Sequence, residues 1–421
     1  MPCGSNQMPK EGRSGLLASP DQLKLSKQKL LFLIADGMGD WPVVELGGRT
    51  PLEAADTPNM DRMSAFGCQG LCRTVPVGMA PGSDVANMSL LGFDPLKCHT
   101  GRGPIEAAAH NLEVSDDDLI WRLNLVTLSD NTDQALMLDY SAGHIDTGKA
   151  RWIIDDLQGS LGNDQFSFHA GVQYRHILIQ HKAERAAALL KVRPPHDILD
   201  QPIAQDFIEL ARCPELLELV RRASVRLAVS AQGSKATAVW PWGQGQPLDL
   251  PDFYKMTGLR GAVISAVDLV RGLGRSAGMA VLEVPGATGL IDTNYEGKVQ
   301  AALDFLKQGD FLYLHLEAPD ECGHSGDCAA KVRSIELFDQ RIVGPLVESL
   351  GETAAFLISC DHLTPLALRT HAPDPVPFMF MQNRDCEINQ RVFNEKTAAS
   401  TGFFLESGAA LISFCLDRIK N

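Results

Sequence analysis

The chain has 421 residues, 45% of them apolar, which is enough to build two or three domains with sizeable cores. Its formal net charge of −14 argues against the clustered lysine and arginine of a surface that binds nucleic acid or anionic membranes. The ten cysteines include no C-x-x-C pair, and no early apolar run is long enough for a signal peptide or membrane span. We therefore expect a cytoplasmic protein with reduced thiols and with neither nucleic-acid nor membrane partners.

The first predicted strand follows a polar N-terminal segment. Residues 1–28 lack apolar periodicity and are predicted to be a flexible N-terminal extension. From Lys29, the sequence KLLFLIADGMGD is an apolar run followed by Asp36 and two glycines, which is typical of a buried parallel strand that ends in a loop. Asp36 would then lie at the carboxyl end of a strand, where open α/β sheets bind their ligands.

Ser83 follows a glycine and precedes an apolar segment, residues 85–91, that we predict to be helical. In isolation, a serine in this position is most simply a helix N-cap. A helix N-terminus also favours the negative charge of a phosphate, so a cap position is compatible with a serine that becomes phosphorylated.

The middle of the chain has a different character. Strand-like runs cover residues 119–128 and 166–179, and helical stretches cover residues 150–161, 203–227 and 262–273. The chemically distinctive residues lie before and after this segment and must meet in the fold. We therefore predict that residues 29–110 and 277–421 form one domain and that residues 111–276 form an inserted α/β cap domain.

The layout of the first strand recurs twice near the C-terminus. Residues 310–316 lead into EAPDECGHSGD, residues 354–359 lead into CDH, and residues 330–350 between them have helical apolar spacing. Strand, helix and strand in succession indicate a parallel sheet, with all three polar clusters at one edge. The predicted fold is thus α/β, with a mostly parallel sheet flanked by helices and a second, inserted domain.

Five late side chains have the chemistry of metal ligands: Asp320, His324, Asp361, His362 and His371. We place Asp320 and His324 four residues apart in a glycine-containing loop, and the Asp361–His362 pair just past a buried strand. Such oxygen and nitrogen donors bind Mn²⁺ or Zn²⁺, and two such ions can hold a phosphoryl group from both sides. Each fragment alone is more simply a capped turn or a loop histidine, but three fragments at strand ends favour a metal site.

At this point a resemblance can be named. The segments ADGMGD, APGSDVANMSLLGFDP, TGRGPIEAA, EAPDECGHSGD, CDH and THAPDPVPF occur in this order between residues 31 and 378. They resemble the successive motifs of archaeal-type cofactor-independent phosphoglycerate mutases, which belong to the alkaline phosphatase superfamily. The resemblance implies an alkaline-phosphatase-like fold, two divalent ions (Mn²⁺ or Zn²⁺) and no use of 2,3-bisphosphoglycerate.

The resemblance also implies roles for individual residues. One ion would be held by Asp320, His324 and His371. The other would be held by Asp36, Ser83, Asp361 and His362. Ser83 would be the nucleophile that takes the phosphoryl group of 3-phosphoglycerate and returns it to the 2-hydroxyl of glycerate.

In this scheme the cap keeps water away from the phosphoserine while glycerate turns. The residues that we expect to hold the carboxylate and hydroxyls are Arg102, Arg122, Asn124, His144, Arg175, His176 and Arg260. The fork of arginine suits carboxylate and phosphate groups, which is the reason for this choice. An arginine in a strand or loop is also often an ion-paired surface residue, so this alternative stays open for each.

Three other functions remain open on the same motifs. The scaffold could transfer phosphate to another small acceptor, as has been proposed for homoserine kinases among the bacterial relatives. It could also be a phosphoester hydrolase, although so large a cap weighs against this, or a binding protein without activity. For each of the enzymatic functions the expected partner is a small phosphorylated substrate. The oligomeric state is left open.

Overall fold

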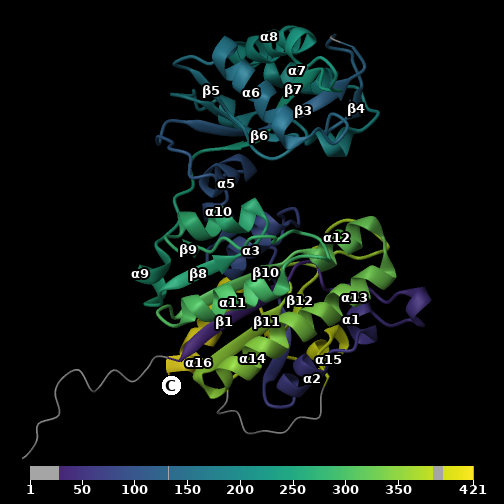
Figure 1. Ribbon diagram of the computed structural model, residues 1–421, viewed down its shortest axis with the longest axis vertical. Coiled ribbons are helices and arrows are strands. Elements are labelled where there is room, and N and C mark those ends of the chain that lie inside the picture. Colours follow the sequence, from purple (N-terminus) through teal and green to yellow (C-terminus); the bar gives the residue numbers. More distant parts are fainter. Residues whose placement is uncertain (1–27, 131, 383–391, 421) are drawn as a thin grey trace, which may run out of the picture.

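The structure is a computed structural model that describes residues 28–130, 132–382 and 392–420. Figure 1 shows two lobes, a core and a cap, joined by a narrow neck beside helix α5 (Arg102–Ala109). The predicted N-terminal extension lies outside the described residues except for Gln28. Within the described parts, no helix has both the length and the apolar content needed to cross a membrane.

The core is built on an eight-stranded sheet with the order β13-β2-β12-β11-β1-β10-β8-β9. All neighbouring pairs are parallel except those that β12 makes with β11 and β2. The strands are β1 (Lys29–Ala35), β2 (Cys68–Cys72), β8 (Gly261–Ile264), β9 (Ala280–Val281), β10 (Phe311–Leu316), β11 (Ala354–Ser359), β12 (Val376–Met381) and β13 (Phe404–Leu405). The mostly parallel sheet predicted from the sequence is confirmed, with the three predicted strands β11, β1 and β10 side by side at its centre.

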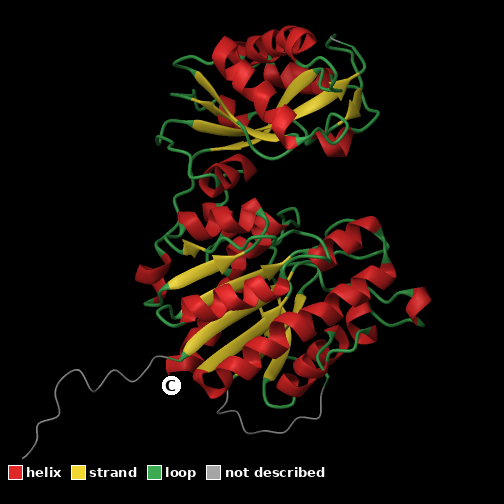
Figure 2. Cartoon of the chain, in the orientation of Figure 1, coloured by secondary structure: helices red, strands yellow, loops and turns green. Residues whose placement is uncertain are grey.

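Helices cover both faces of this sheet (Figure 2). One face carries α3 (Ser83–Leu90), with α10 (Asp268–Ser276) and α16 (Gly408–Lys420) each packed on it. The other face carries α2 (Pro58–Ser64), α11 (Tyr295–Leu306), α13 (Cys328–Phe338) and α14 (Gly344–Leu350). Shorter core helices are α1 (Pro51–Ala54), α4 (Pro95–Cys98), α9 (Phe253–Thr257), α12 (Ala318–Ser325) and α15 (Glu395–Ser400).

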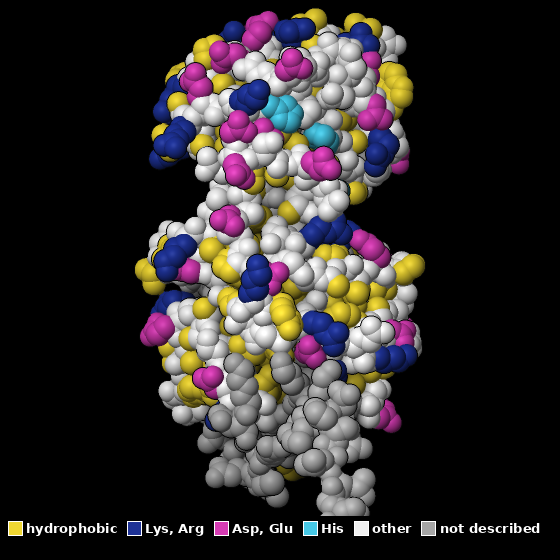
Figure 3. Space-filling model, turned by 90° about the vertical axis from the view of Figure 1, so that its left-hand side faces the viewer, with side chains coloured by type: hydrophobic (Ala, Val, Ile, Leu, Met, Phe, Trp, Pro, Cys, Tyr) yellow, Lys and Arg dark blue, Asp and Glu magenta, His cyan; other side chains and the backbone are white. Residues whose placement is uncertain are grey.

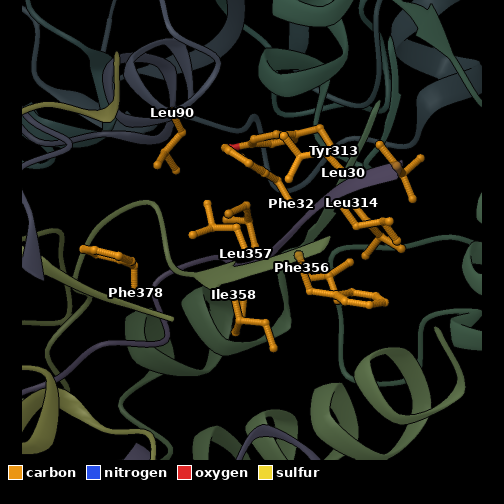
Figure 4. Packing of buried hydrophobic residues seen from close by; sticks show 14 of the residues in the cluster. Leu30, Phe32, Leu90, Tyr313, Leu314, Phe356, Leu357, Ile358 and Phe378 are labelled. Carbon is orange, nitrogen blue, oxygen red and sulfur yellow. The ribbon is translucent and has the colours of Figure 1, made fainter. Parts of the chain in front are cut away.

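The central strands are buried on both sides, which explains their uninterrupted apolar sequences. In Figure 4, Phe32 and Tyr313 pack toward Leu90 of α3, whereas Phe356 and Ile358 point to the opposite face. All five side chains are fully buried. The sheet is thus fixed in register by two apolar layers, and only the strand ends are free to carry polar chemistry.

The cap contains a five-stranded antiparallel sheet with the order β4-β3-β6-β5, in which β7 also pairs with β3. Its strands are β3 (Leu119–Leu128), β4 (Met137–Asp139), β5 (Phe166–His169), β6 (Arg175–Gln180) and β7 (Ala238–Gly245). Its helices are α6 (Thr147–Leu161), α7 (Ala204–Leu210) and α8 (Pro214–Ser230). It has its own apolar core, centred on residues such as Trp121, Ile154 and Trp240.

The neck brings two distant chain segments into backbone contact. A Cβ added at Gly101 would overlap the carbonyl of Gln244, and one added at Gly245 would overlap the carbonyl of Thr100. Gly101 also has φ of +149°, which disfavours other residues. These glycines let the entering and leaving chains run side by side between core and cap.

Several predicted boundaries are wrong. The predicted helix 262–273 is instead strand β8 followed by α10, and β8 pairs with β10 in the core sheet. The chain has therefore returned to the core well before residue 276, the predicted end of the cap, because Gly261–Ile264 is a short buried strand rather than the start of an amphipathic helix.

Three other predicted elements are interrupted. The strand-like run 166–179 is the hairpin β5–β6, and the helical run 203–227 is divided into α7 and α8, with Pro214 at the first position of α8. The helical run 330–350 is divided by a π-helical turn over Asp339–Val343. In each case the apolar pattern was read correctly but the interruption was not.

Candidate active site

The polar residues after the central strands meet at one edge of the core sheet. Asp36 follows β1, Asp361 and His362 follow β11, and Asp320 lies on α12, four residues beyond β10. Gly37 has φ of +60°, and a Cβ added there would lie 2.8 Å from the Cα of Asp320. The loop after β1 therefore packs directly on α12, and only glycine fits at this position.

Asp320, His324 and His371 form the first group of side chains. The predicted loop around Asp320 is in fact the helix α12, which places Asp320 and His324 one turn apart on the same face. His324 Nε2 lies 3.2 Å from Asp320 Oδ2 and 3.0 Å from His371 Nε2. His371 Nε2 lies 3.7 Å from Asp320 Oδ1. The three side chains that the resemblance grouped do lie together, whereas the predicted loop around Asp320 and His324 is wrong.

Asp36, Asp361, His362 and Ser83 form the second group. His362 Nε2 lies 3.5 Å from Asp36 Oδ1, 3.5 Å from Asp361 Oδ2 and 3.2 Å from Ser83 Oγ. The ring of His362 also lies 4.1 Å from that of His371, measured between centroids. His362 thus stands between the two groups, and Asp320, His362 and His371 have donor atoms within 4.8 Å of one another.

The position of Ser83 differs from that of an ordinary capping serine. It is the first residue of α3, and the cap residue before it is Gly82, with no side-chain cap bond. Asn87, one turn later, donates from Nδ2 to the Ser83 carbonyl at 2.8 Å and to Asp361 Oδ2 at 2.7 Å. Tyr313 OH donates to Asn87 Oδ1 at 2.5 Å. The Ser83 hydroxyl is therefore not used as a cap and points to His362, while Asn87 fixes the helix start against Asp361.

His315 was missed by sequence reasoning and belongs to the same site. It lies near the end of β10, fully buried, with Nε2 3.4 Å from Asp36 Oδ2 and 3.9 Å from Asp361 Oδ2. Its Nδ1 lies 3.3 Å from Glu317 Oε1, and the buried Lys298 donates to Glu317 Oε2 at 3.1 Å. The signal available in the sequence was a histidine in an otherwise apolar strand, two residues before Glu317.

Negative charge is concentrated in this site. Burial, together with the Asp361 and Asp320 carboxylates, raises the pKa of Asp36 well above its ordinary value. Burial acts in the same direction on Asp361, but His362 and His315 outweigh it and hold the pKa of Asp361 below its usual range. Three buried carboxylates this close are best compensated by positive charge, which is what divalent cations supply.

The imidazoles respond to the same charges in different ways. The hydrogen bond to Asp320 raises the pKa of His324 to about 9. Burial, together with the neighbouring His362, lowers the pKa of His371 to about 4, so this ring keeps a lone pair for a ligand. For His315, Asp361 and Glu317 overcome the effect of burial and raise the pKa to about 9.

Two further residues stabilise the loops that carry the candidate metal ligands. Thr364 donates to Asp320 Oδ1. The fully buried Lys331 donates to the carbonyls of Gly39 and Thr364, at 3.3 and 2.8 Å, and to Asp40 Oδ2 at 2.8 Å. One ammonium group thus joins the loop after β1 to the loop after β11.

Arg102 is a predicted substrate residue that binds Asp84, the residue directly after Ser83. Its Nε and Nη2 donate to the two carboxylate oxygens of Asp84 at 3.2 and 3.3 Å. His99 Nε2 lies 2.8 Å from the same carboxylate. Despite the burial of Asp84, these two neighbours hold its pKa below its ordinary value. A fork-shaped cation is therefore fixed beside the helix N-terminus that carries Ser83.

Arg122 and Asn124 lie in the cap, on β3. Arg122 is buried, pairs with Glu106 Oε1 at 3.1 Å, and has its guanidinium 4.3 Å from the ring centre of Trp242. Burial, with the nearby Arg102 and Arg175, lowers its pKa. The side-chain Oδ1 of Asn124 accepts from Trp242 Nε1 at 3.0 Å. Trp242 was missed, and it links these two predicted residues.

The remaining candidates are placed differently. Arg175 and His144 are exposed residues of the cap beside Tyr174, at 5.8 and 6.4 Å. His176 is buried, and burial lowers its pKa to about 3. Arg260 precedes β8 and pairs with Asp310, which precedes β10, at 3.5 Å. It therefore lies at the amino ends of the strands, opposite to the candidate site, and its prediction as a substrate residue is wrong.

Comparison with known proteins adds independent findings. A sequence profile of the family described as 2,3-bisphosphoglycerate-independent phosphoglycerate mutase matches residues 65–229. A relative from Geobacter sulfurreducens, named "Probable 2,3-bisphosphoglycerate-independent phosphoglycerate mutase", is 45% identical and covers 93% of this chain and 100% of its own. A relative from Methanothrix thermoacetophila, named as such a mutase without that qualifier, is 44% identical over 91% and 98% of the two chains.

Two solved structures are similar over almost the whole chain. A protein from Pyrococcus horikoshii has a TM-score of 0.77 at 27% identity and covers 94% of this chain and 98% of its own. The cofactor-independent phosphoglycerate mutase from Thermoplasma acidophilum has a TM-score of 0.62 at 24% identity and covers 94% and 100%. The second likeness shows that the two proteins share a fold.

Proposed function

Because the chain belongs to the 2,3-bisphosphoglycerate-independent phosphoglycerate mutase family, we propose that it interconverts 3-phosphoglycerate and 2-phosphoglycerate through a phosphoserine at Ser83. One observation carries this proposal. The hydroxyl of Ser83 is free of any capping role and lies at the junction of two groups of buried carboxylates and imidazoles. A serine held in this way is a nucleophile next to a site for phosphoryl oxygens.

The donor set fits two divalent cations. We assign Asp320, His324 and His371 to one ion and Asp36, Ser83, Asp361 and His362 to the other, with Mn²⁺ or Zn²⁺ as the candidates. The distances of 3.0 to 3.7 Å within the first group are those of side chains converging on one point. Two ions bound there would neutralise charge on the phosphoryl oxygens during transfer.

The chain's own residues define the steps. Ser83 Oγ loses its proton and forms a bond to phosphorus as the bond from phosphorus to O3 of 3-phosphoglycerate breaks; O3 takes up a proton, leaving phosphoserine and glycerate. Glycerate turns, and its 2-hydroxyl oxygen takes the phosphoryl group back, which frees Ser83. His362 would hold an ion through the Nε2 lone pair in this scheme, so it would not serve as the base for Ser83. In this proposal Arg102, which is bound to Asp84 next to Ser83, binds phosphoryl or carboxylate oxygens.

The cap supplies the second half of the binding site in this proposal. Arg122, Asn124, His144 and Arg175 lie in the cap together with the ring of Trp242. The charge of Arg175 also favours the ionised forms of Glu321 and Asp268 in the core. Closure of the cap would exclude water from phosphoserine and so favour transfer back to glycerate over hydrolysis.

A purified-enzyme assay tests the proposal. With Mn²⁺ and no added 2,3-bisphosphoglycerate, the full chain should convert 3-phosphoglycerate to 2-phosphoglycerate and release little inorganic phosphate. Phosphorylation of homoserine without isomerisation, or phosphate release in excess of isomerisation, would overturn it in favour of a kinase or a hydrolase. We keep the cytoplasm as the proposed location, which agrees with the eight described cysteines being free thiols.

A further inference from the structure

A second cluster of nucleophilic and titratable side chains lies in the cap. It consists of Ser167 and His169 of β5, His181 directly after β6, and Asp118 directly before β3. Ser167 Oγ lies 2.9 Å from His181 Nε2 and 3.0 Å from His169 Nε2. His181 Nδ1 lies 3.1 Å from Asp118 Oδ1. Among the described contacts, no hydrogen bond or ion pair joins these residues to the candidate metal ligands.

The hairpin geometry explains why these side chains meet. Residues 167 and 169 lie on the same face of β5, since side chains alternate along a strand. Ser167 is opposite Ile179 in the register of β5 and β6, and His181 is two positions further along on that face. His181 is therefore a diagonal neighbour of Ser167, within reach of a long side chain. The backbone pairing continues there, with His181 N bonded to the Gln165 carbonyl at 2.8 Å.

The hydrogen-bond partners determine where the protons are. The Asp118 carboxylate is only 4% exposed and also accepts from Ser115 N at 2.9 Å, so it can only accept from His181 Nδ1–H. His181 Nε2 then has a lone pair and accepts the hydroxyl proton of Ser167. The remaining lone pair of Ser167 Oγ accepts from His169 Nε2–H. Burial and the neighbouring His181 lower the pKa of His169, which keeps this ring a neutral donor.

From this arrangement we propose that the cap carries a second nucleophile, Ser167, with His181 as its general base and Asp118 as the positioning residue, and that it hydrolyses small acyl esters. The order nucleophile, base, orienting carboxylate is recognised by geometry and not by sequence position. His169 Nε2–H lies close enough to Ser167 Oγ to donate to the carbonyl oxygen as it becomes negative.

The reaction balances with water as the co-substrate. Ser167 Oγ bonds to the ester carbonyl carbon while its proton passes to His181 Nε2, and that proton then leaves with the alcohol. Water attacks the acyl-serine with His181 again as base, which releases a carboxylic acid and restores Ser167. No oxidant, reductant or metal is required.

The location of the cluster limits the substrate to small esters. Ser167 is half-buried on one face of the hairpin, so only small reagents can reach its hydroxyl. The side chain of His181 is 31% exposed, and histidine side chains of the cap reach the surface shown in Figure 3. An open site of this kind suits short acyl groups with good leaving groups more than large substrates.

The test uses the full chain with Ser83→Ala, which removes the other nucleophile. An alkyl fluorophosphonate should place one phosphonyl group on Ser167, located by peptide mass mapping, and 4-nitrophenyl acetate should be hydrolysed. Ser167→Ala should abolish both. His181→Gln should slow both by about 100-fold or more, which is the contribution of a general base. Ser160→Ala, at an exposed serine of α6 in the same cap, should change neither.

Label distributed over many serines, ester hydrolysis that survives Ser167→Ala, or a labelling rate unaffected by His181→Gln would overturn the inference. Asp118→Asn is the second test of the base, because it is isosteric and should slow labelling while leaving Ser167 in place. Far-UV circular dichroism verifies that each cap variant is folded. The mutase assay gives a second check on the same cap substitutions made in a chain that keeps Ser83. Since Ser83 is absent from the labelling experiment, its outcome is independent of the proposed mutase reaction.

Discussion

Replacing Lys331 by methionine should destabilise the core and loosen the metal site together. The ammonium group of Lys331 is fully buried and pairs with Asp40, whose side chain is 1% exposed. It also donates to the carbonyls of Gly39 and Thr364, which follow the ligand-bearing ends of β1 and β11. Methionine fills a similar volume but donates nothing, so one carboxylate and two carbonyls lose their partner.

The expected loss follows from the uncompensated charge. Removing one partner of a buried ion pair costs about 3–5 kcal/mol, mainly because the other charge stays buried. Asp40 keeps its bonds from Trp41 N and Leu366 N, which places the loss toward the lower end of that range. Adding Asp40→Asn to Lys331→Met removes the stranded charge and should recover part of the loss. Lys307→Met, at an exposed ion pair, should cost less than about 1 kcal/mol.

Native-state hydrogen exchange measures this effect lobe by lobe. In Lys331→Met the amides of β1 and β11 should lose protection by about 3 kcal/mol, whereas those of β3 in the cap should be unchanged. Affinity for Mn²⁺ should fall in the same variant, because the two ligand loops are no longer joined. Unchanged protection in β1 and β11, or a double variant less stable than Lys331→Met alone, would refute the role given to this lysine.

Three further changes have defined outcomes. Burial raises the pKa of Glu395 from 4.5 to about 7, so the folded chain retains a proton that the unfolded chain loses. The free energy of unfolding should therefore fall by roughly 3 kcal/mol between pH 4.5 and 7. Glu395→Gln should remove this pH dependence when denaturation is measured at several pH values. Arg102→Lys breaks the bidentate hydrogen bond to Asp84 and should lower kcat/KM by about 10- to 100-fold in the mutase assay. An unchanged kcat/KM would contradict the role given to Arg102. His315→Gln should weaken Mn²⁺ binding by about 10- to 100-fold in chelator competition, and full affinity would show that it does not orient Asp36.

The sequence predicted the parts of the site that follow buried strands. Uninterrupted apolar runs before Asp36 and before Asp361 are visible without tertiary information, and parallel strands bring their carboxyl ends to one edge. The predicted grouping of Asp320 with His324 also agrees with the structure. In each case a local pattern was sufficient.

The misses have a common physical cause, which is that tertiary neighbours decide them. Gly261–Ile264 is too short to distinguish a buried strand from a helix start, and its pairing with β10 decides the matter. His315 is an apolar-strand residue until Asp36 is placed beside it. Arg260 has the right chemistry, but the direction of β8 places it at the opposite edge of the sheet. Trp242 gains its role only by stacking on Arg122.

The phosphorylated enzyme itself is the most direct target for measurement. Rapid quenching of the Mn²⁺-loaded protein with ³²P-labelled 3-phosphoglycerate, followed by peptide mapping, should place the label on Ser83 alone, formed and discharged fast enough to account for turnover. Ser83→Ala should take up no label and form no 2-phosphoglycerate. Label on another residue, or isomerisation by Ser83→Ala, would contradict the covalent route through this serine.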